Sequence, residues 1–210
     1  MARALKRLFD IVVAAGALLM LWPLLLIIAL LIRLKMGRPV LFRQERPGYK
    51  ARPFTVYKFR TMTVASGDAA NVSRDAQRLT PLGRTLRDWT LDELPQFWNV
   101  LRGDVSLVGP RPLLMQYLGR YTPEQARRHD VKPGLTGWAQ VNGRNGQSWE
   151  DRFALDVWYV DHWSLALDAR IIWRTMASVV KKEGIAQEGH ATMPEFMGSE
   201  RSREPGAVGK

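Results

Sequence analysis

The chain contains no cysteine and only three histidines. Without cysteine it cannot form disulfides, thiolate zinc sites, iron–sulfur clusters or a cysteine nucleophile. The histidines, at positions 129, 162 and 190, are spaced in no zinc-binding pattern. The sequence also lacks a Walker phosphate loop, a GxGxxG fingerprint, an HExxH motif and a GxSxG nucleophile elbow. With these signatures absent, we look for chemistry among carboxylates, lysines and arginines.

Acidic residues are fewer than basic ones, with 20 Asp+Glu against 31 Lys+Arg and a net charge of +11 over 210 residues. This length suits one domain with a sizeable core. Much of the excess charge flanks one apolar run. Arg3, Lys6 and Arg7 precede it, and basic residues dominate residues 33–50 after it. Because most of this charge lies beside the apolar run, nucleic-acid binding is not expected.

The apolar run extends from Ile11 to Ile32, 22 residues without a charge. As a helix it would reach about 33 Å, enough for a bilayer core. Basic residues on both flanks favour the cytoplasmic side for both ends. Pro23, after Trp22, removes a helical hydrogen bond in mid-run. A re-entrant helix broken at Trp22–Pro23 satisfies both flanks, and a spanning helix with a proline kink also fits, so the residues alone leave both open.

The rest of the chain predicts an α+β fold with a small irregular sheet. Strands are expected at Val40–Phe42 and Phe54–Phe59, a helix–turn–helix over Pro81–Leu101, and helices at Trp149–Val160 and Asp168–Glu183. Residues 103–112 and 132–147, rich in turn-forming residues, are expected to be irregular. Aromatic residues are dense between positions 149 and 173, a density that suits a core or interfacial helices resting among lipid headgroups.

Two adjacent carboxylates, Asp92 and Glu93, are the candidate reactive groups. Thr90 and Glu93 match a capping box, which would give Glu93 a structural role without explaining Asp92. A carboxylate in the first turn of a helix is stabilised in its ionised form. Such a group can attack phosphorus or hold Mg²⁺.

Many fixed cations accompany this pair in turn-rich segments. Arginine forks match phosphate oxygens, and carboxylates that hold a hard cation beside several arginines are typical of phosphoryl transfer. The candidate cations are Lys58, Arg60, Arg84, Arg87, Arg102, Arg111 and Arg144.

Several ordered motifs together resemble a known family. They are Lys58-Phe-Arg-Thr-Met62, Leu91-Asp-Glu-Leu-Pro-Gln96, Asn99–Asp104, Ser106-Leu-Val-Gly-Pro-Arg-Pro112 and Lys132–Asn145. From about Lys6 to Met197 the chain resembles the bacterial sugar transferases, in the small form called monotopic phosphoglycosyl transferases.

The resemblance implies a membrane enzyme of the bacterial inner membrane. Residues 1–36 would form the re-entrant helix, broken at Trp22–Pro23, and residues 37–197 a catalytic domain on the cytoplasmic face. Residues 198–210, rich in polar residues, are expected to be a disordered tail. The implied reaction transfers sugar 1-phosphate from a UDP-sugar to polyprenyl (undecaprenyl) phosphate and releases UMP, which starts glycan assembly.

The resemblance also assigns roles to residues. Asp92 would be the nucleophile of a ping-pong mechanism, and Glu93, with Asp92, would hold Mg²⁺. The phosphate-side cations would be Lys58, Arg60, Arg87 and Arg111, with Arg144 facing the donor. Membrane lipids and a second copy of the chain are further expected partners.

An alternative function is a non-catalytic membrane-anchored module that binds anionic lipids or glycan-assembly partners. It explains the basic flanks and the aromatic residues equally well. It gives no reason for Asp92 and Glu93 to lie among arginines.

Overall fold

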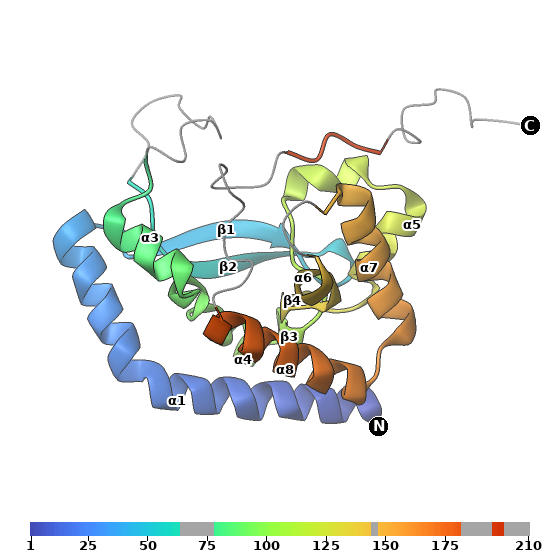
Figure 1. Ribbon diagram of the computed structural model, residues 1–210, viewed down its shortest axis with the longest axis horizontal. Helices are drawn as coiled ribbons and strands as arrows, with labels where there is room; N and C mark the ends of the chain where they lie inside the picture. The colour runs from blue at the N-terminus through green and yellow to red at the C-terminus, as the bar shows by residue number, and fades with distance from the viewer. Residues whose placement is uncertain (64–77, 144–146, 182–194, 200–210) are drawn as a thin grey trace, which may run out of the picture.

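The computed structural model describes residues 1–63, 78–143, 147–181 and 195–199. It mixes helices with short strands, which confirms the α+β prediction at that level (Figure 1). In chain order the elements are α1 (Ala2–Met36), β1 (Leu41–Pro47), η1 (Tyr49–Ala51), β2 (Pro53–Phe59), α3 (Pro81–Asp88), η3 (Leu91–Glu93), α4 (Gln96–Arg102), β3 (Ser106–Val108), η4 (Met115–Arg120), α5 (Pro123–Ala126), η5 (Arg127–Asp130), β4 (Gly134–Thr136), α6 (Trp138–Asn142), α7 (Trp149–His162) and α8 (Leu165–Lys181).

The described strands form two separate two-stranded sheets rather than one irregular sheet. β1 and β2 are antiparallel, with Leu41 opposite Phe59. β3 and β4 are parallel, with Ser106 opposite Gly134. A parallel pair needs a crossover connection, and η4, α5 and η5 supply it. The segments predicted to be irregular therefore contain β3, β4 and α6, which are too short to give a clear periodic signal.

Helix α1 is continuous over 35 residues and contains Pro23. It changes direction part-way along its length (Figure 1). Proline removes one hydrogen bond and its ring crowds the preceding turn, so we attribute the bend to Pro23. The structure thus has one continuous, bent helix, where the family resemblance implies a break at Trp22–Pro23. By length and composition α1 could cross a membrane, and 11% of its most apolar window is buried within the protein.

The first turns of α1 are bonded to the folded domain. Lys6 Nζ lies 2.5 Å from Asp168 Oδ2 on α8. Arg7 donates to two backbone carbonyls of α4 at 2.6 and 2.7 Å. Asp10 Oδ1 accepts a hydrogen bond from the backbone N–H of Leu107 in β3, with an N–O distance of 3.1 Å. Two cations of the basic flank are therefore bonded within the protein.

The other end of α1 is closed by Arg60, which is 6% exposed. Its guanidinium donates to the carbonyl oxygens of Met36, Gly37 and Arg38, at 2.5, 2.9 and 3.1 Å. The last carbonyls of a helix have no partner within the helix, and a basic side chain there satisfies them. Both ends of α1 are thus attached to the same domain.

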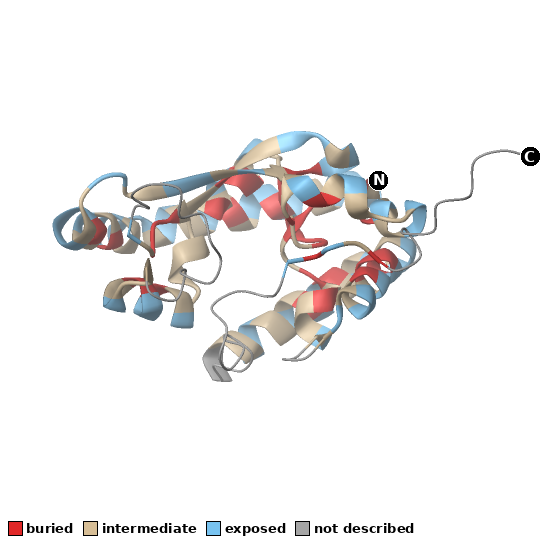
Figure 2. Ribbon diagram, turned by 90° about the horizontal axis from the view of Figure 1, so that it is seen from above, coloured by how far each residue is buried: buried red, intermediate tan, exposed pale blue. Residues whose placement is uncertain are grey.

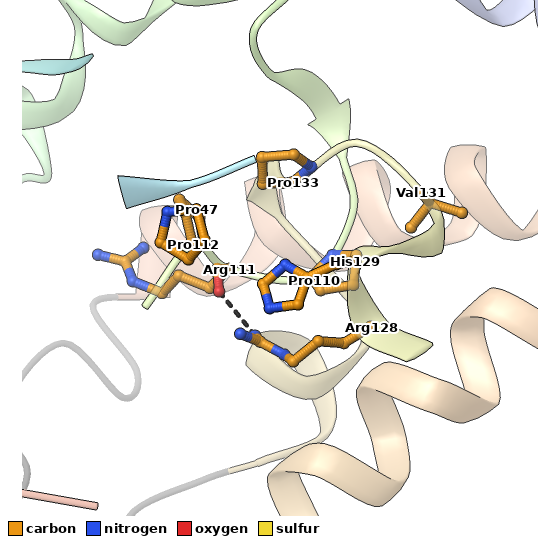
Figure 3. Close-up of a pocket in the computed structure, with 8 residues that line it drawn as sticks. All are labelled: Pro47, Pro110, Arg111, Pro112, Arg128, His129, Val131 and Pro133. Atoms are coloured by element: carbon orange, nitrogen blue, oxygen red, sulfur yellow. Dashed lines mark hydrogen bonds between the residues drawn. The ribbon is translucent and has the colours of Figure 1, made fainter. Parts of the chain in front are cut away.

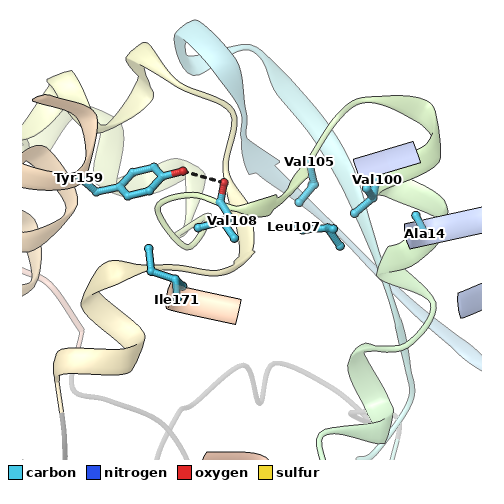
Figure 4. Packing of buried hydrophobic residues seen from close by; sticks show 7 residues of the cluster. All are labelled: Ala14, Val100, Val105, Leu107, Val108, Tyr159 and Ile171. Atoms are coloured by element: carbon cyan, nitrogen blue, oxygen red, sulfur yellow. Dashed lines mark hydrogen bonds between the residues drawn. The ribbon is translucent and has the colours of Figure 1, made fainter. Parts of the chain in front are cut away.

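Buried residues lie on the inward faces of the helices and along the strands (Figure 2). One core cluster joins α1, α4, β3, α7 and α8, and Figure 4 shows its members. They are Ala14, Val100, Val105, Leu107, Val108, Tyr159 and Ile171. A second cluster packs Ile28 and Ile32 of α1 against Phe59 and Leu86. Burial of these groups fixes α1 and β3 relative to each other.

Helices α3, α4, α7 and α8 confirm the predicted helical segments, and β1 and β2 confirm the predicted strands. The dense aromatic segment divides between two environments. Phe153 and Tyr159 are buried, whereas Trp173 is 76% exposed. Most of the predicted tail lies outside the described residues, but Phe196 just before it is buried against Tyr117 and Phe153.

Candidate active site

The two carboxylates lie in η3, a single turn that follows α3. α3 ends at Asp88, and Thr90 adopts a left-handed conformation with φ 55° and ψ 19°. This region is unusual for a β-branched residue, and it redirects the chain. The Thr90 side chain makes no capping hydrogen bond, so the predicted capping box with Glu93 is wrong. The side chain of Glu93 faces cations instead.

Glu93 is held by Lys58 at the end of β2 and by Arg111 after β3. Its Oε1 lies 2.5 Å from Lys58 Nζ and 2.6 Å from Arg111 Nη2. Its Oε2 has a longer contact, 3.5 Å from Arg111 Nη1. Burial opposes ionisation of this carboxyl, but Arg111 and Lys58 outweigh it and lower the pKa of Glu93 to about 2. Glu93 is therefore a fixed negative charge that joins three segments distant in the sequence.

Asp92 has a different environment. Among the described residues, none donates a hydrogen bond to its carboxylate or forms an ion pair with it. Burial, followed by the charge of Glu93, raises the pKa of Asp92 to about 6, against the opposing charges of Lys58, Arg87 and Arg111. The expected helix-terminus stabilisation does not dominate. At neutral pH, Asp92 is a largely ionised carboxylate, and no described residue bonds to it.

The predicted phosphate-side cations separate into two groups. Lys58 and Arg111 contact Glu93, and the charge of Arg87 acts on Asp92 while its Nε donates to Thr61 Oγ1 at 3.1 Å. Arg60 is not brought to the carboxylates, because it binds the carbonyls at the end of α1. Arg144 lies outside the described residues.

Glycines allow the loop that carries Arg111 to pack closely. A Cβ on Gly134 would lie 2.1 Å from the backbone N of Gly109, and a Cβ on Gly137 would lie 2.2 Å from the Gly109 carbonyl oxygen. No other residue fits at such distances without displacing backbone. The motifs Ser106–Pro112 and Lys132–Asn145 therefore pack backbone against backbone next to Arg111.

No group of three or more His, Asp or Glu side chains that could hold a metal ion occurs in the described ranges. Mg²⁺ commonly takes one or two carboxylates and completes its shell with substrate phosphates and water. The carboxylate of Asp92, which has no bonded partner in the described ranges, and the loosely contacted Oε2 of Glu93 fit that requirement. The pair therefore suits Mg²⁺ bound together with a phosphate substrate.

The sequence gives no signal for two buried ion pairs, one behind the Arg111 loop and one where α1 joins the domain. Arg128 and Asp156 form a buried ion pair, and Lys6 reaches Asp168 across the fold. The partners are 28 and 162 residues apart. No local spacing rule connects such pairs, and a buried charge of this kind looks like a surface residue in the sequence.

A family model described as bacterial sugar transferase matches residues 1–182 of the chain. The chain belongs to the bacterial sugar transferase family. This match confirms the family that the sequence motifs predicted.

Several curated relatives of this sugar transferase are similar over most of its length. "Uncharacterized sugar transferase EpsL" of Bacillus subtilis is 55% identical over 195 residues, 93% of this chain and 96% of the relative. "UDP-glucose:undecaprenyl-phosphate glucose-1-phosphate transferase" of Caulobacter vibrioides is 44% identical, covering 83% of this chain and 69% of the relative. The Escherichia coli protein of the same name is 42% identical over 83% of this chain and 40% of its own length. These names agree with an enzyme of the phosphoglycosyl transferase class.

Proposed function

We propose that this sugar transferase moves sugar 1-phosphate from a UDP-sugar to undecaprenyl phosphate and releases UMP. The observation that carries the proposal is the half-buried carboxylate of Asp92, to which no described residue bonds, beside Glu93 and three cations. Relatives at 42–44% identity are named for this reaction with UDP-glucose. A site that supplies one carboxylate nucleophile and several positive charges suits transfer at a diphosphate.

In the proposed mechanism Asp92 acts twice. Its carboxylate oxygen attacks the sugar-proximal phosphorus of the donor, a new P–O bond forms, and the bond from that phosphorus to the bridging oxygen breaks, so that UMP leaves. A phosphate oxygen of the lipid acceptor then attacks the same phosphorus and displaces Asp92. The covalent route divides one transfer into two steps, which lets a soluble donor and a membrane-bound acceptor use the same site in turn.

The neighbouring groups have distinct proposed roles. Arg111 and Lys58 hold Glu93 in place and present positive charge to phosphate oxygens, and Arg87 adds a third cation beside Asp92. Asp92 and Glu93 would hold Mg²⁺, which neutralises charge on the transferring phosphate when bound. The short bonds to Glu93 Oε1 leave Oε2 as its more accessible ligand.

We also propose that α1 is re-entrant and that the domain lies on the cytoplasmic face. Lys6, Arg7 and Asp10 attach the first turns of α1 to the domain, and Arg60 attaches its last carbonyls to the same domain. A helix that crossed the bilayer would leave its two ends on opposite faces. Positively charged flanks favour the cytoplasm for both ends. The large exposed apolar side chains between them, such as Leu19, Met20 and Leu26, would lie in lipid.

Cysteine labelling tests this topology, because the native chain has no cysteine. Arg3→Cys places a thiol at the exposed start of α1, and Arg38→Cys places one at an exposed position just after its end. In inverted membrane vesicles, which expose the cytoplasmic face, we expect a membrane-impermeant maleimide to label both variants. Labelling of one variant in inverted vesicles and of the other in spheroplasts would contradict re-entry.

The activity is tested by UMP release from a panel of UDP-sugars with undecaprenyl phosphate and Mg²⁺. We expect release with at least one donor, and loss of release when EDTA removes the metal. The Asp92→Asn variant serves as the negative control. If folded protein in nanodiscs releases no UMP with any donor of the panel, the proposal is contradicted and the non-catalytic binding module is favoured.

A further inference from the structure

A buried ion pair lies directly behind the loop that carries Arg111. Arg128 Nη2 and Nε lie 2.7 and 3.1 Å from Asp156 Oδ2, and the two side chains are 1% and 2% exposed. The same Nη2 lies 2.7 Å from the backbone carbonyl oxygen of Arg111. Figure 3 shows this carbonyl facing Arg128 while the Arg111 guanidinium extends away from it. One buried cation therefore binds the backbone of the residue whose side chain binds Glu93.

Arg128 is restrained on every side. Its Nη1 lies 3.4 Å from the Tyr121 hydroxyl, and its guanidinium lies over the rings of Tyr121 and Phe153 at 5.8 and 5.6 Å. Asp156 comes from α7, a 14-residue helix. A planar guanidinium with bonds to a carboxylate, a hydroxyl and a carbonyl has one compatible orientation. The position of the Arg111 carbonyl is therefore set by α7 through Arg128.

The backbone around the Arg111 loop is restricted, and two further arginines act on this cluster through their charge, Arg152 on Asp156 and Arg46 on Arg111. The small pocket between the loop and Arg128 is lined by Pro47, Pro110, Pro112 and Pro133, whose φ angles are fixed. His129 also lines it, and burial, followed by the charge of Arg128, lowers the pKa of His129 to about 4. At neutral pH His129 is uncharged. Among the described residues, Arg128 is the cation that forms an ion pair with Asp156.

A buried ion pair is weak evidence for a role in stability, because apolar residues of similar volume often stabilise a core equally well. What an apolar pair cannot supply is a directional hydrogen bond to the Arg111 carbonyl. We propose that Arg128, oriented by Asp156, is a positioning residue that fixes Arg111 so that its guanidinium stays on Glu93. The inference rests on the proposed function, in which Arg111 and Glu93 act at the phosphates.

Arg128→Lys tests this inference because it keeps the buried positive charge but removes the planar fork. Arg127→Lys is the matched control, since Arg127 is adjacent and binds Glu124 and Asp161 at the surface. Hydrogen exchange of the full-length protein in nanodiscs reports on the loop through two amides. Gly109 N–H donates to the Thr136 carbonyl oxygen and Gly134 N–H to that of Pro110.

We expect Arg128→Lys to speed exchange in peptides that contain these two amides by about 10-fold, with peptides of α1 unchanged. Arg127→Lys should leave both regions unchanged. Unchanged exchange at Gly109 and Gly134 in Arg128→Lys would overturn the inference. If that variant does not fold, Asp156→Glu, which keeps the negative charge but shifts the carboxylate that orients Arg128, takes its place with the same criteria.

A double-mutant cycle with Arg111→Ala separates positioning from general destabilisation. We expect Arg128→Lys to lower kcat/KM for UMP release about 10-fold in the wild-type background and less than about 2-fold in the Arg111→Ala background. Equal factors in both backgrounds would assign Arg128 a structural role and overturn the inference. If the wild-type protein releases no UMP, the proposed function fails, and the exchange measurement alone decides whether Arg128 positions the loop.

Discussion

Two carboxylates in this sugar transferase are held in nearly the same way but lie in regions with different tasks. Glu93 forms ion pairs with Lys58 at 2.5 Å and with Arg111 at 2.6 Å. Asp168 forms an ion pair with Lys6 at 2.5 Å and accepts hydrogen bonds from the Tyr159 hydroxyl at 2.7 Å and the Trp163 indole at 3.1 Å. Both side chains are largely shielded from solvent.

The difference lies in what surrounds each carboxylate. At Asp168 the donors are shared with the backbone, because Lys6 and Tyr159 both also donate to the Val108 carbonyl oxygen, the latter contact being drawn in Figure 4. At Glu93 a second carboxylate, Asp92, is adjacent, and no described residue bonds to it. A cluster whose groups are satisfied internally attaches α1 to the domain. A half-buried carboxylate to which no described residue bonds is typical of a site that binds a substrate or a metal ion.

Glu93→Gln gives the largest expected effect, on activity. Removing the charge releases Lys58 and Arg111 from their fixed positions, so UMP release should fall by about 100-fold or more. The measurement is kcat at saturating donor, with Glu124→Gln as an exposed control that we expect to be near wild type. Activity of Glu93→Gln within about threefold of wild type would show that the Glu93 cluster, like the Asp168 cluster, has a structural role only.

Asp168→Asn is the corresponding change at the junction, and its expected effect is on stability. Lys6 would lose its counter-charge in a largely buried position, which should lower the free energy of unfolding by about 3 kcal/mol. Thermal unfolding followed by tryptophan fluorescence measures this loss. Asp161→Asn, in a surface pair with Arg127, should cost about 0.5 kcal/mol or less. Equal losses in the two variants would show that the junction contributes little.

Arg60→Leu tests the structural role of a cation that the sequence placed at the phosphates. It leaves the carbonyls at the end of α1 without their donor, so we expect about 2 kcal/mol lower stability and near wild-type activity of the folded fraction. Arg170→Leu, at an exposed position of α8, is the control. A loss of activity in Arg60→Leu without a loss of stability would show that Arg60 acts in the active site.

Thr90→Asn gives the smallest expected effect. Asparagine tolerates the left-handed region better than threonine, so the change should stabilise the protein by about 0.5–1 kcal/mol. Thr85→Asn in the exposed turn of α3 is the comparison, where we expect no gain. Equal small losses in both variants would argue against strain at position 90.

The sequence was sufficient for the parts that depend on local pattern. Periodic apolar patterns located α3, α7 and α8. Ordered motifs selected Asp92, Glu93 and Arg111, which the fold brings together.

Long-range pairing decided the parts that local pattern could not. Lys58 and Arg60 alternate in the sequence with the period of one strand face, yet Lys58 reaches η3 and Arg60 reaches α1. Thr90 and Glu93 have capping-box spacing, but the two cations on Glu93 outweigh a local cap. The choice between partners depends on which segments meet in space, and a single sequence does not encode that in its spacing.

Trapping the covalent intermediate tests the central claim most directly. Wild-type protein is mixed with the active UDP-sugar and Mg²⁺ without lipid acceptor, and its intact mass is measured after rapid acid quench. We predict a mass increase of one sugar phosphate, located on the peptide that contains Asp92, absent in Asp92→Asn and lost when undecaprenyl phosphate is added. Turnover by the wild-type protein without any adduct, or an adduct of the same mass on Asp92→Asn, would contradict the assignment of Asp92 as nucleophile.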